Sequence, residues 1–276
     1  MRTWHASLLK SAGPGASTAA KSYRLLRAIL ATAVEDGRIG ANPCVIKGGG
    51  VERSTERPTV SVQQVFALAS AIDARYRAIV LVAAFSGLRR GELFGLRRRH
   101  IDVGAGAISV EEQRQRLDRG GVITAEPKTA AGRRVVTLPA AIMRELSAHL
   151  DAWAAPGSDG YVFTGDKGGP VSEQVLHHRW TAARRSLGLE HVHFHDLRHV
   201  AGTLAASTGA GTKELMHRLG HASPAAALRY QHATSERDEA IAAAMDGVIA
   251  SAMGEQPRRG RRPAHQAQEL DLDVDV

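Results

Sequence analysis

The stretch that decides the fold is HFHDLRHVAGTLAASTGAGTKELMHRLGHASPAAALRYQHAT, residues 193–234. It opens on a cluster of histidine and arginine, continues through an apolar helical pattern, and ends on a Gly-His pair and a single tyrosine. His195 and Arg198 lie three residues apart at a predicted helix start, so their side chains share one face of that helix. Because helix N-termini favour anions, this pair suits a phosphate, but a surface histidine beside an ion-paired arginine has the same spacing.

Two upstream segments carry residue types that suit the same ligand. In SGLRRGEL (86–93), Glu92 follows Arg89 by three residues, a spacing at which a carboxylate can orient a phosphate-binding guanidinium. In PKTAAGRR (127–134), Lys128 lies in a predicted turn between two predicted strands, where it can reach a neighbouring site and donate a proton. Taken singly, each of these residues is compatible with an ordinary role as a surface ion pair or a solvated turn lysine.

The histidine and tyrosine at the end of the opening stretch are equally ambiguous when taken alone. His221 follows Gly220 directly, and Tyr230 comes nine residues later at helical spacing. A histidine in this position is commonly a helix cap or a core residue, and a tyrosine is commonly part of the core. Only the joint order of all these residues along the chain favours a catalytic site.

That order resembles the active-site pattern of the tyrosine recombinase family, also called phage-type integrases. The family's motifs stand here as SGLRRGEL, PKTAAGRR, HDLRH, RLGH and a tyrosine, and the resemblance covers roughly residues 57–250. It implies six catalytic residues and one supporting residue, which are Arg89, Lys128, His195, Arg198, His221 and the nucleophile Tyr230, supported by Glu92.

The resemblance implies a site-specific DNA recombinase of a mobile element, which cuts and rejoins DNA by transesterification. Tyr230 would attack a phosphodiester to give a 3′-phosphotyrosyl bond and a free 5′-hydroxyl. Arg89 and Arg198 would hold the non-bridging oxygens, Lys128 would protonate the leaving oxygen, and His195 would act as the base. Bond energy is conserved, so no cofactor is expected. No Asp, Glu or His cluster has convincing metal-ligand spacing, so no metal is expected.

Composition supports a polyanionic partner. The 276 residues carry a formal net charge of +8 at pH 7, with an isoelectric point near 10.1, and these values favour a polyanionic partner, most commonly nucleic acid. The resemblance implies that this partner is double-stranded DNA. The single cysteine, Cys44, excludes an internal disulfide. The most apolar stretch, residues 79–88, is much shorter than a membrane span, so we expect no membrane partner. The resemblance implies a cytoplasmic location, at the bacterial nucleoid.

Periodicity predicts a mainly α-helical chain with a small three-stranded antiparallel β-sheet, an α+β fold. Residues 17–43 are expected to form an amphipathic helix, Ser61 and Gln64 have the spacing of a capping box at a helix start, a further helix is expected to end at Gly87, and a last helix is expected at 235–253. The three predicted strands are residues 107–113, 121–126 and 133–139. The resemblance makes this the integrase catalytic-core fold, preceded by a partial helical core-binding domain. The expected domains are a core-binding remnant at 1–45, a linker at 46–57, the catalytic domain at 58–253, and a disordered charged tail at 254–276.

Three functions stay open at this point. Core-binding domains of the family are usually longer than 45 residues, so we expect either a misplaced start or a truncated integrase. The chain is then an active recombinase, a non-recombining DNA-binding remnant, or an enzyme that relaxes DNA by the same chemistry. The resemblance also implies a homotetramer on DNA, leaves room for an accessory excision factor, and gives His199 a packing or bridging role rather than a chemical one.

Overall fold

The computed structural model describes residues 1–10, 15–52, 60–117, 120–127 and 130–230, together with parts of 239–249. The chain divides into two compact units, unit 1 at residues 1–59 and unit 2 at residues 60–276. Lys128 and the predicted tail at 254–276 lie outside the described residues, as does most of the predicted segment at 235–253.

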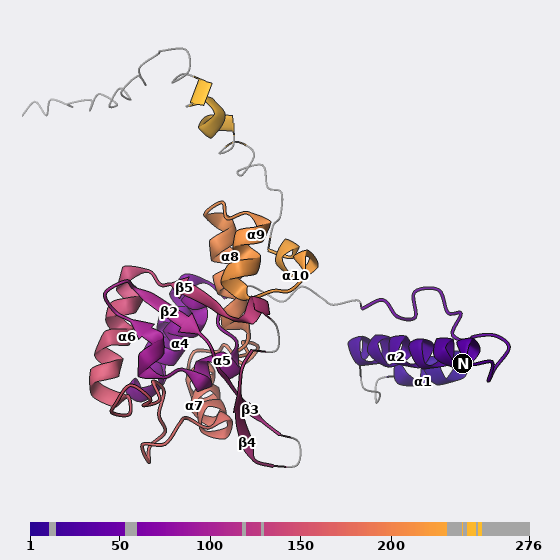
Figure 1. Cartoon of the computed structure of the whole chain (residues 1–276), viewed down its shortest axis with the longest axis horizontal. Helices are drawn as coiled ribbons and strands as arrows, with labels where there is room; N and C mark the ends of the chain where they lie inside the picture. Colours follow the sequence, from indigo (N-terminus) through magenta and orange to yellow (C-terminus); the bar gives the residue numbers. More distant parts are fainter. Residues whose placement is uncertain are drawn as a thin grey trace, which may run out of the picture. The chain divides into compact units, whose positions relative to one another are not determined.

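Unit 1 is a pair of helices, α1 (Arg2–Leu8) and α2 (Ala16–Glu35), followed by an irregular segment (Figure 1). The hydroxyl of Tyr23, a buried residue of α2, accepts a hydrogen bond of 2.6 Å from the backbone N–H of Ile46. Arg24 donates to the carbonyl of Gly50 and pairs with Glu52. The first part of the predicted linker therefore packs against α2.

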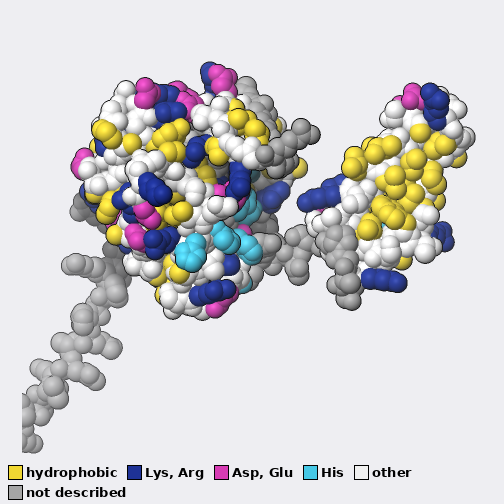
Figure 2. Space-filling model, turned by 90° about the horizontal axis from the view of Figure 1, so that it is seen from below, with side chains coloured by type: hydrophobic (Ala, Val, Ile, Leu, Met, Phe, Trp, Pro, Cys, Tyr) yellow, Lys and Arg dark blue, Asp and Glu magenta, His cyan; other side chains and the backbone are white. Residues whose placement is uncertain are grey.

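The sequence predicted α2 as an amphipathic helix, yet part of its apolar face is exposed. Leu25 and Ile29 are 65% and 55% exposed, and the buried residues of α2 are Ala19, Ala20 and Tyr23. Figure 2 shows hydrophobic side chains gathered over one face of this unit. The buried residues of α2 are thus two alanines and one tyrosine, whereas Leu25 and Ile29 lie on the surface of unit 1.

Unit 2 is built around α4 (Ala74–Ser86), which packs against α3 (Val62–Ala71), α6 (Ala140–Trp153) and α8 (Asp196–Ser207). Helix α3 begins with the predicted capping box, in which Ser61 and Gln64 exchange side-chain and backbone hydrogen bonds. Helix α4 ends, as predicted, at Gly87, which takes the left-handed conformation with φ of 71°.

Shorter elements complete unit 2 around this core. Further α-helices of unit 2 are α5 (Arg90–Gly95), α7 (Glu173–Ser186), α9 (Thr212–Leu219) and α10 (Pro224–Leu228). Two short 3₁₀ helices lie at Arg98–His100 and Ala130–Gly132. Within the ranges given above, no helix is both long enough and apolar enough to cross a membrane.

Unit 2 contains a three-stranded antiparallel sheet as predicted, but one of the three predicted strands lies in a separate two-stranded sheet. The sheet has the antiparallel order β1 (Ile101–Asp102), β2 (Ala107–Val110) and β5 (Arg134–Thr137). The predicted strand at 121–126 instead forms β4 (Val122–Ala125), which pairs with β3 (Gln113–Arg116) in a separate hairpin (Figure 1). Strand β2 has β1 and β5 on its two edges, so β4 cannot also pair with β2.

A close approach of two helix ends creates the setting for the candidate site. A Cβ atom on Gly87 would lie 2.5 Å from a methyl group of Leu219 at the end of α9, and 3.2 Å from Cβ of Ala201 on α8. The absence of a side chain at Gly87 therefore lets the ends of α4 and α9 meet beside α8.

Candidate active site

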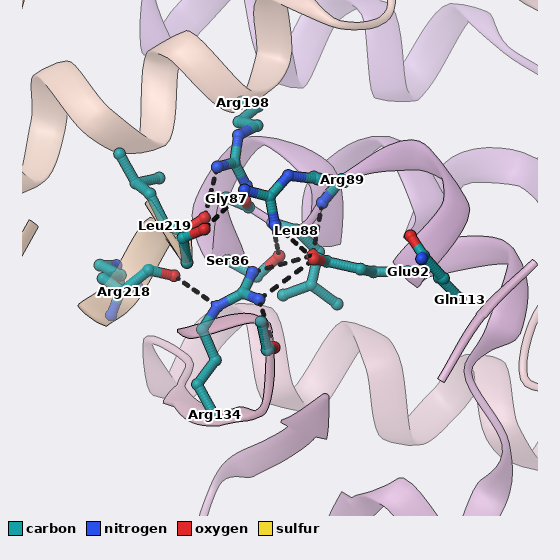
Figure 3. Close-up of polar contacts among 12 residues, drawn as sticks. Ser86, Gly87, Leu88, Arg89, Glu92, Gln113, Arg134, Arg198, Arg218 and Leu219 are labelled. Atoms are coloured by element: carbon teal, nitrogen blue, oxygen red, sulfur yellow. Dashed lines mark hydrogen bonds and ion pairs between the residues drawn. The ribbon is translucent and has the colours of Figure 1, made fainter. Parts of the chain in front are cut away.

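The two arginines of the predicted phosphate site are anchored where these helix ends meet (Figure 3). Arg198 is 5% exposed and donates from its two terminal nitrogens to the carbonyls of Gly87 and Leu219. Arg89 donates from Nη2 to the carbonyl of Gly220 at 2.5 Å. Backbone carbonyls at the ends of α4 and α9 thus fix both guanidinium groups at neighbouring positions.

Glu92 orients Arg89 in the way that the sequence spacing predicted. Its carboxylate accepts from Nη1 and from the backbone N–H of Arg89, each at 2.8 Å, and Glu92 is only 1% exposed. Burial alone would raise the pKa of this carboxyl. The opposing effect of Arg134 and Arg89 is larger and lowers the pKa below its usual value. Glu92 is therefore an anion at neutral pH and remains available to hold Arg89.

Arg134 is the residue of this cluster that the sequence interpretation missed. Its fully buried side chain on β5 donates to both carboxylate oxygens of Glu92, at 3.2 and 2.8 Å. It also donates to the carbonyls of Gly132 and Arg218, each at 3.0 Å. The signal that identifies it is the alternation of β5, because Arg134 shares the inward-facing side with the buried Val136.

Gly220, the glycine before His221, is required by Arg134. A Cβ atom there would lie 2.7 Å from Nη1 of Arg134, and the φ angle of Gly220 is 63°. The chain therefore passes directly over the buried guanidinium in a left-handed conformation that favours glycine. The carbonyl of Gly220 accepts the hydrogen bond from Arg89.

His221 is neutral at physiological pH. Its burial, followed by the positive charges of Arg198 and Arg89, lowers its pKa to about 4. Its Nδ1 atom is buried and has no hydrogen-bond partner among the residues that the structure describes. A neutral imidazole with one N–H can donate a hydrogen bond to an anion without adding a charge.

Burial and the neighbouring cations lower the pKa of Arg198 to about 10, so it stays protonated at neutral pH. With His221 neutral, Arg89, Arg134 and Arg198 face the single negative charge of Glu92. The cluster thus carries an excess of two positive charges, which suits a bound phosphodiester.

Tyr230, the predicted nucleophile, lies against the same cluster. It is 8% exposed, and its ring stacks on that of His221 with an interplanar angle of 7° and centroids 6.3 Å apart. Burial raises the pKa of its phenol, and the charges of Arg198 and Arg229 oppose that shift without cancelling it. Its hydroxyl makes a hydrogen bond of 2.8 Å with Nδ1 of His199.

His195, the predicted base, lies one helical turn before His199, and the two rings are edge to face with centroids 5.6 Å apart. Burial, then His199 and Arg198, lowers the pKa of His195 below its usual value. The structure therefore brings together Arg89, Arg198, His195, His221 and Tyr230. Lys128 lies outside the described residues, so its position relative to them stays a prediction.

A basic groove of about 740 Å³ opens beside Arg89 and His195. It runs between α5, the β3–β4 hairpin and the start of α7, and its lining includes Arg90, Arg114 and Arg116. Figure 2 shows histidine side chains gathered on one face of unit 2. No group of three or more His, Cys, Asp or Glu side chains in the described ranges is placed to hold a metal ion. The groove therefore offers a cationic path that leads to the predicted phosphate site.

Comparisons with known proteins agree with this geometry. The model of the Phage integrase family matches residues 59–237. The chain is 37% identical over 247 residues to the prophage phiRv2 integrase of Mycobacterium tuberculosis, covering 88% of this chain and 64% of that relative. It is 34% identical over 234 residues to the integrase of Mycobacterium phage FRAT1, covering 81% of this chain and 68% of that relative. The chain thus spans about two thirds of the length of each of these two relatives.

Among solved structures, the Tn1549 transposon integrase, determined in complex with a circular intermediate DNA, shares the fold with a TM-score of 0.74. That similarity covers 88% of this chain and 84% of the other chain, at 24% identity. The family match extends from α3 to just beyond Tyr230 and so includes every residue of the site described above. By the extent of that match and by its identity to the phage integrases, the chain belongs to the phage integrase family.

Proposed function

We propose that the chain is a site-specific DNA recombinase that cuts and rejoins DNA through a 3′-phosphotyrosyl intermediate. The observation that carries this proposal is the placement of Arg89 and Arg198, both fixed by backbone carbonyls, beside the buried Tyr230. Support comes from relatives named integrases and from the Tn1549 transposon integrase, which was solved with DNA.

The charges of the site fit the chemistry of phosphoryl transfer. Negative charge gathers on the non-bridging oxygens of a phosphodiester during displacement, so fixed cations stabilise the transition state. Arg89 and Arg198 supply these cations, and His221 adds a neutral hydrogen bond. Because backbone carbonyls already hold both guanidinium groups, little reorganisation accompanies the reaction.

Tyr230 attacks phosphorus, the bond to the 5′-oxygen breaks, and Lys128 protonates that oxygen. A phenol is only about 0.1% ionised at neutral pH, so the attack needs a proton acceptor. Within the family pattern His195 takes that role, and Glu92 keeps Arg89 in position. In the second step a 5′-hydroxyl attacks the phosphotyrosyl bond and releases Tyr230, so the number of phosphodiester bonds is conserved.

The partners follow from this reaction. The proposed substrate is double-stranded DNA, which the basic groove beside Arg89 suits. Exchange of two duplexes requires four cuts, so we propose a homotetramer on DNA, with an accessory excision factor as a further candidate partner. A bacterial enzyme of this kind acts in the cytoplasm, at the nucleoid.

A gel assay with nicked duplexes tests the proposal, because the nick lets the cleaved end diffuse away and traps the covalent adduct. The duplexes come from DNA that flanks the coding sequence, with random-sequence duplexes beside them. We expect an adduct that Tyr230→Phe abolishes and that Tyr161→Phe, a control tyrosine packed under Arg97, retains.

The same preparations separate the two alternatives. An adduct together with exchange of two duplexes supports the recombinase. An adduct with relaxation of supercoiled DNA and no exchange supports the DNA-relaxing enzyme. DNA binding without an adduct on any duplex supports the non-recombining remnant and contradicts the proposal.

A further inference from the structure

The hydroxyl of Tyr230 is held by His199, which is not among the six catalytic residues that the resemblance implies. The distance from Nδ1 of His199 to Oη of Tyr230 is 2.8 Å, an ordinary hydrogen-bond length. Their ring centroids are 5.8 Å apart with an interplanar angle of 44°. His199 follows Arg198 directly on α8, so one helical turn carries both a phosphate-binding cation and the partner of the nucleophile.

Helix α8 is shaped to seat the tyrosine ring beside His199. A Cβ atom on Gly202 would lie 2.7 Å from two atoms of the Tyr230 ring, so only a glycine admits the ring at this position. With the ring stacked on His221 as well, Tyr230 is 8% exposed. Its hydroxyl is thereby directed to the His199 imidazole by packing as well as by the hydrogen bond.

The other two histidines are less suited to accept the phenol proton. The rings of His221 and Tyr230 lie parallel with centroids 6.3 Å apart, and among the described residues no hydrogen bond joins His221 to the Tyr230 hydroxyl. His195 is in contact with His199, ring to ring, and no hydrogen bond links it to Tyr230 among the residues placed by the structure. His199 is thus the imidazole in direct contact with the reacting oxygen.

We propose that His199 is a catalytic residue that accepts the proton of the Tyr230 hydroxyl during cleavage and returns it during rejoining. This inference rests on the proposed function and changes the identity of the base within it. A neutral imidazole with its proton on Nε2 presents the Nδ1 lone pair to the phenol. His195 then acts behind His199, as the residue that positions its ring.

The transfer balances in both directions. In cleavage the O–H bond of Tyr230 breaks and an N–H bond forms at Nδ1 of His199, while the oxygen attacks phosphorus and the bond to the 5′-oxygen breaks. Lys128 gives that oxygen a proton. In rejoining the 5′-hydroxyl returns its proton to Lys128, and the imidazolium of His199 protonates the departing Tyr230 oxygen.

Two substitutions separate proton acceptance from structure. His199→Asn places an amide where Nδ1 lies, so it keeps a hydrogen-bonding group but accepts no proton. His199→Gln carries its amide further along the side chain and gives a second variant if the first fails to fold. His191→Asn, at an exposed loop histidine, is the matched control, and melting and DNA binding are measured for every variant.

The decisive measurement is the single-turnover rate of adduct formation with Tyr230 replaced by a fluorinated tyrosine, whose phenol is more acidic. We expect His199→Asn to slow cleavage by roughly 10²–10⁴-fold with ordinary tyrosine. We expect the fluorinated tyrosine to recover most of that loss, because an acidic phenol ionises without a base. A structural defect would not respond to phenol acidity.

The outcomes distinguish this inference from the proposed function. If wild-type protein forms the adduct and His199→Asn does so at the same rate, or if its loss is not recovered by the fluorinated tyrosine, His199 is not the proton acceptor. If wild-type protein forms no adduct on any duplex, the proposed function fails, and the catalytic role of His199 fails with it.

Discussion

Replacing Arg134 by methionine removes a buried guanidinium while keeping a long side chain in the core of unit 2. The change leaves the carboxylate of Glu92 buried and deprives it of its two hydrogen bonds from Arg134. Breaking one side of a buried ion pair costs about 3–5 kcal/mol in unfolding free energy. Because Arg89 still donates twice to Glu92, we expect the lower end of that range, about 3 kcal/mol.

The neighbouring arginine provides the matched control. Arg133 pairs with Glu126 at 2.6 Å, but their side chains are 59% and 74% exposed. An exposed pair of this kind contributes about 0–1 kcal/mol, so Arg133→Met is expected to change stability little. The two substitutions are identical in chemistry and adjacent in sequence, and they differ in burial and in the additional hydrogen bonds that Arg134 makes to the carbonyls of Gly132 and Arg218.

Urea unfolding followed by tryptophan fluorescence measures both variants, in a Trp4→Phe background that removes the tryptophan of unit 1. With a denaturant slope near 3 kcal/mol per molar for a unit of this size, Arg134→Met lowers the midpoint by about 1 M. Arg133→Met leaves the midpoint nearly unchanged. Equal shifts for the two variants, or no shift for Arg134→Met, would refute the role assigned to the buried pair.

Three further predictions concern single residues. Gly202→Ala places a Cβ atom 2.7 Å from the Tyr230 ring, so the rate of adduct formation falls. In the control Gly169→Ala, a Cβ atom meets nothing within 4 Å, and the rate of adduct formation stays unchanged. The pKa of Glu92 is lowered in the folded protein, so its ionised form adds to the free energy of unfolding above pH 4.5, and this contribution is lost as the pH falls through the folded-state pKa. In Glu92→Gln, this part of the acid dependence is absent when the free energy of unfolding is measured against pH. His221 titrates near pH 4 by imidazole NMR, and a midpoint near 6.5 would contradict its burial among cations.

Local sequence signals predicted the helix boundaries well because each depends on neighbouring residues. Ser61 and Gln64 form their capping box within one helical turn, and Gly87 ends α4 because a left-handed residue follows the last turn. The Arg89–Glu92 contact is equally local and was predicted from spacing. Interactions that close within a few residues can be predicted from a single sequence.

Interactions that join distant segments were not predicted. Glu92 and Arg134 lie 42 positions apart, and only the packing of β5 against α5 and α9 brings the guanidinium to the carboxylate. Strand patterns likewise predict where strands occur but not which strands pair, so the strand at 121–126 was assigned to the wrong sheet. The contact of His199 with Tyr230 spans 31 positions and depends on the small size of Gly202.

Mass spectrometry of the trapped DNA adduct, after nuclease and protease digestion, tests most directly whether the arginine cluster and the tyrosine form one phosphoryl-transfer site. We predict a nucleotide attached to the peptide that contains Tyr230 in wild-type protein, and none when Arg198→Ala removes the buried guanidinium. A nucleotide attached to any other residue, or an undiminished adduct in Arg198→Ala, would contradict the assignment of this site.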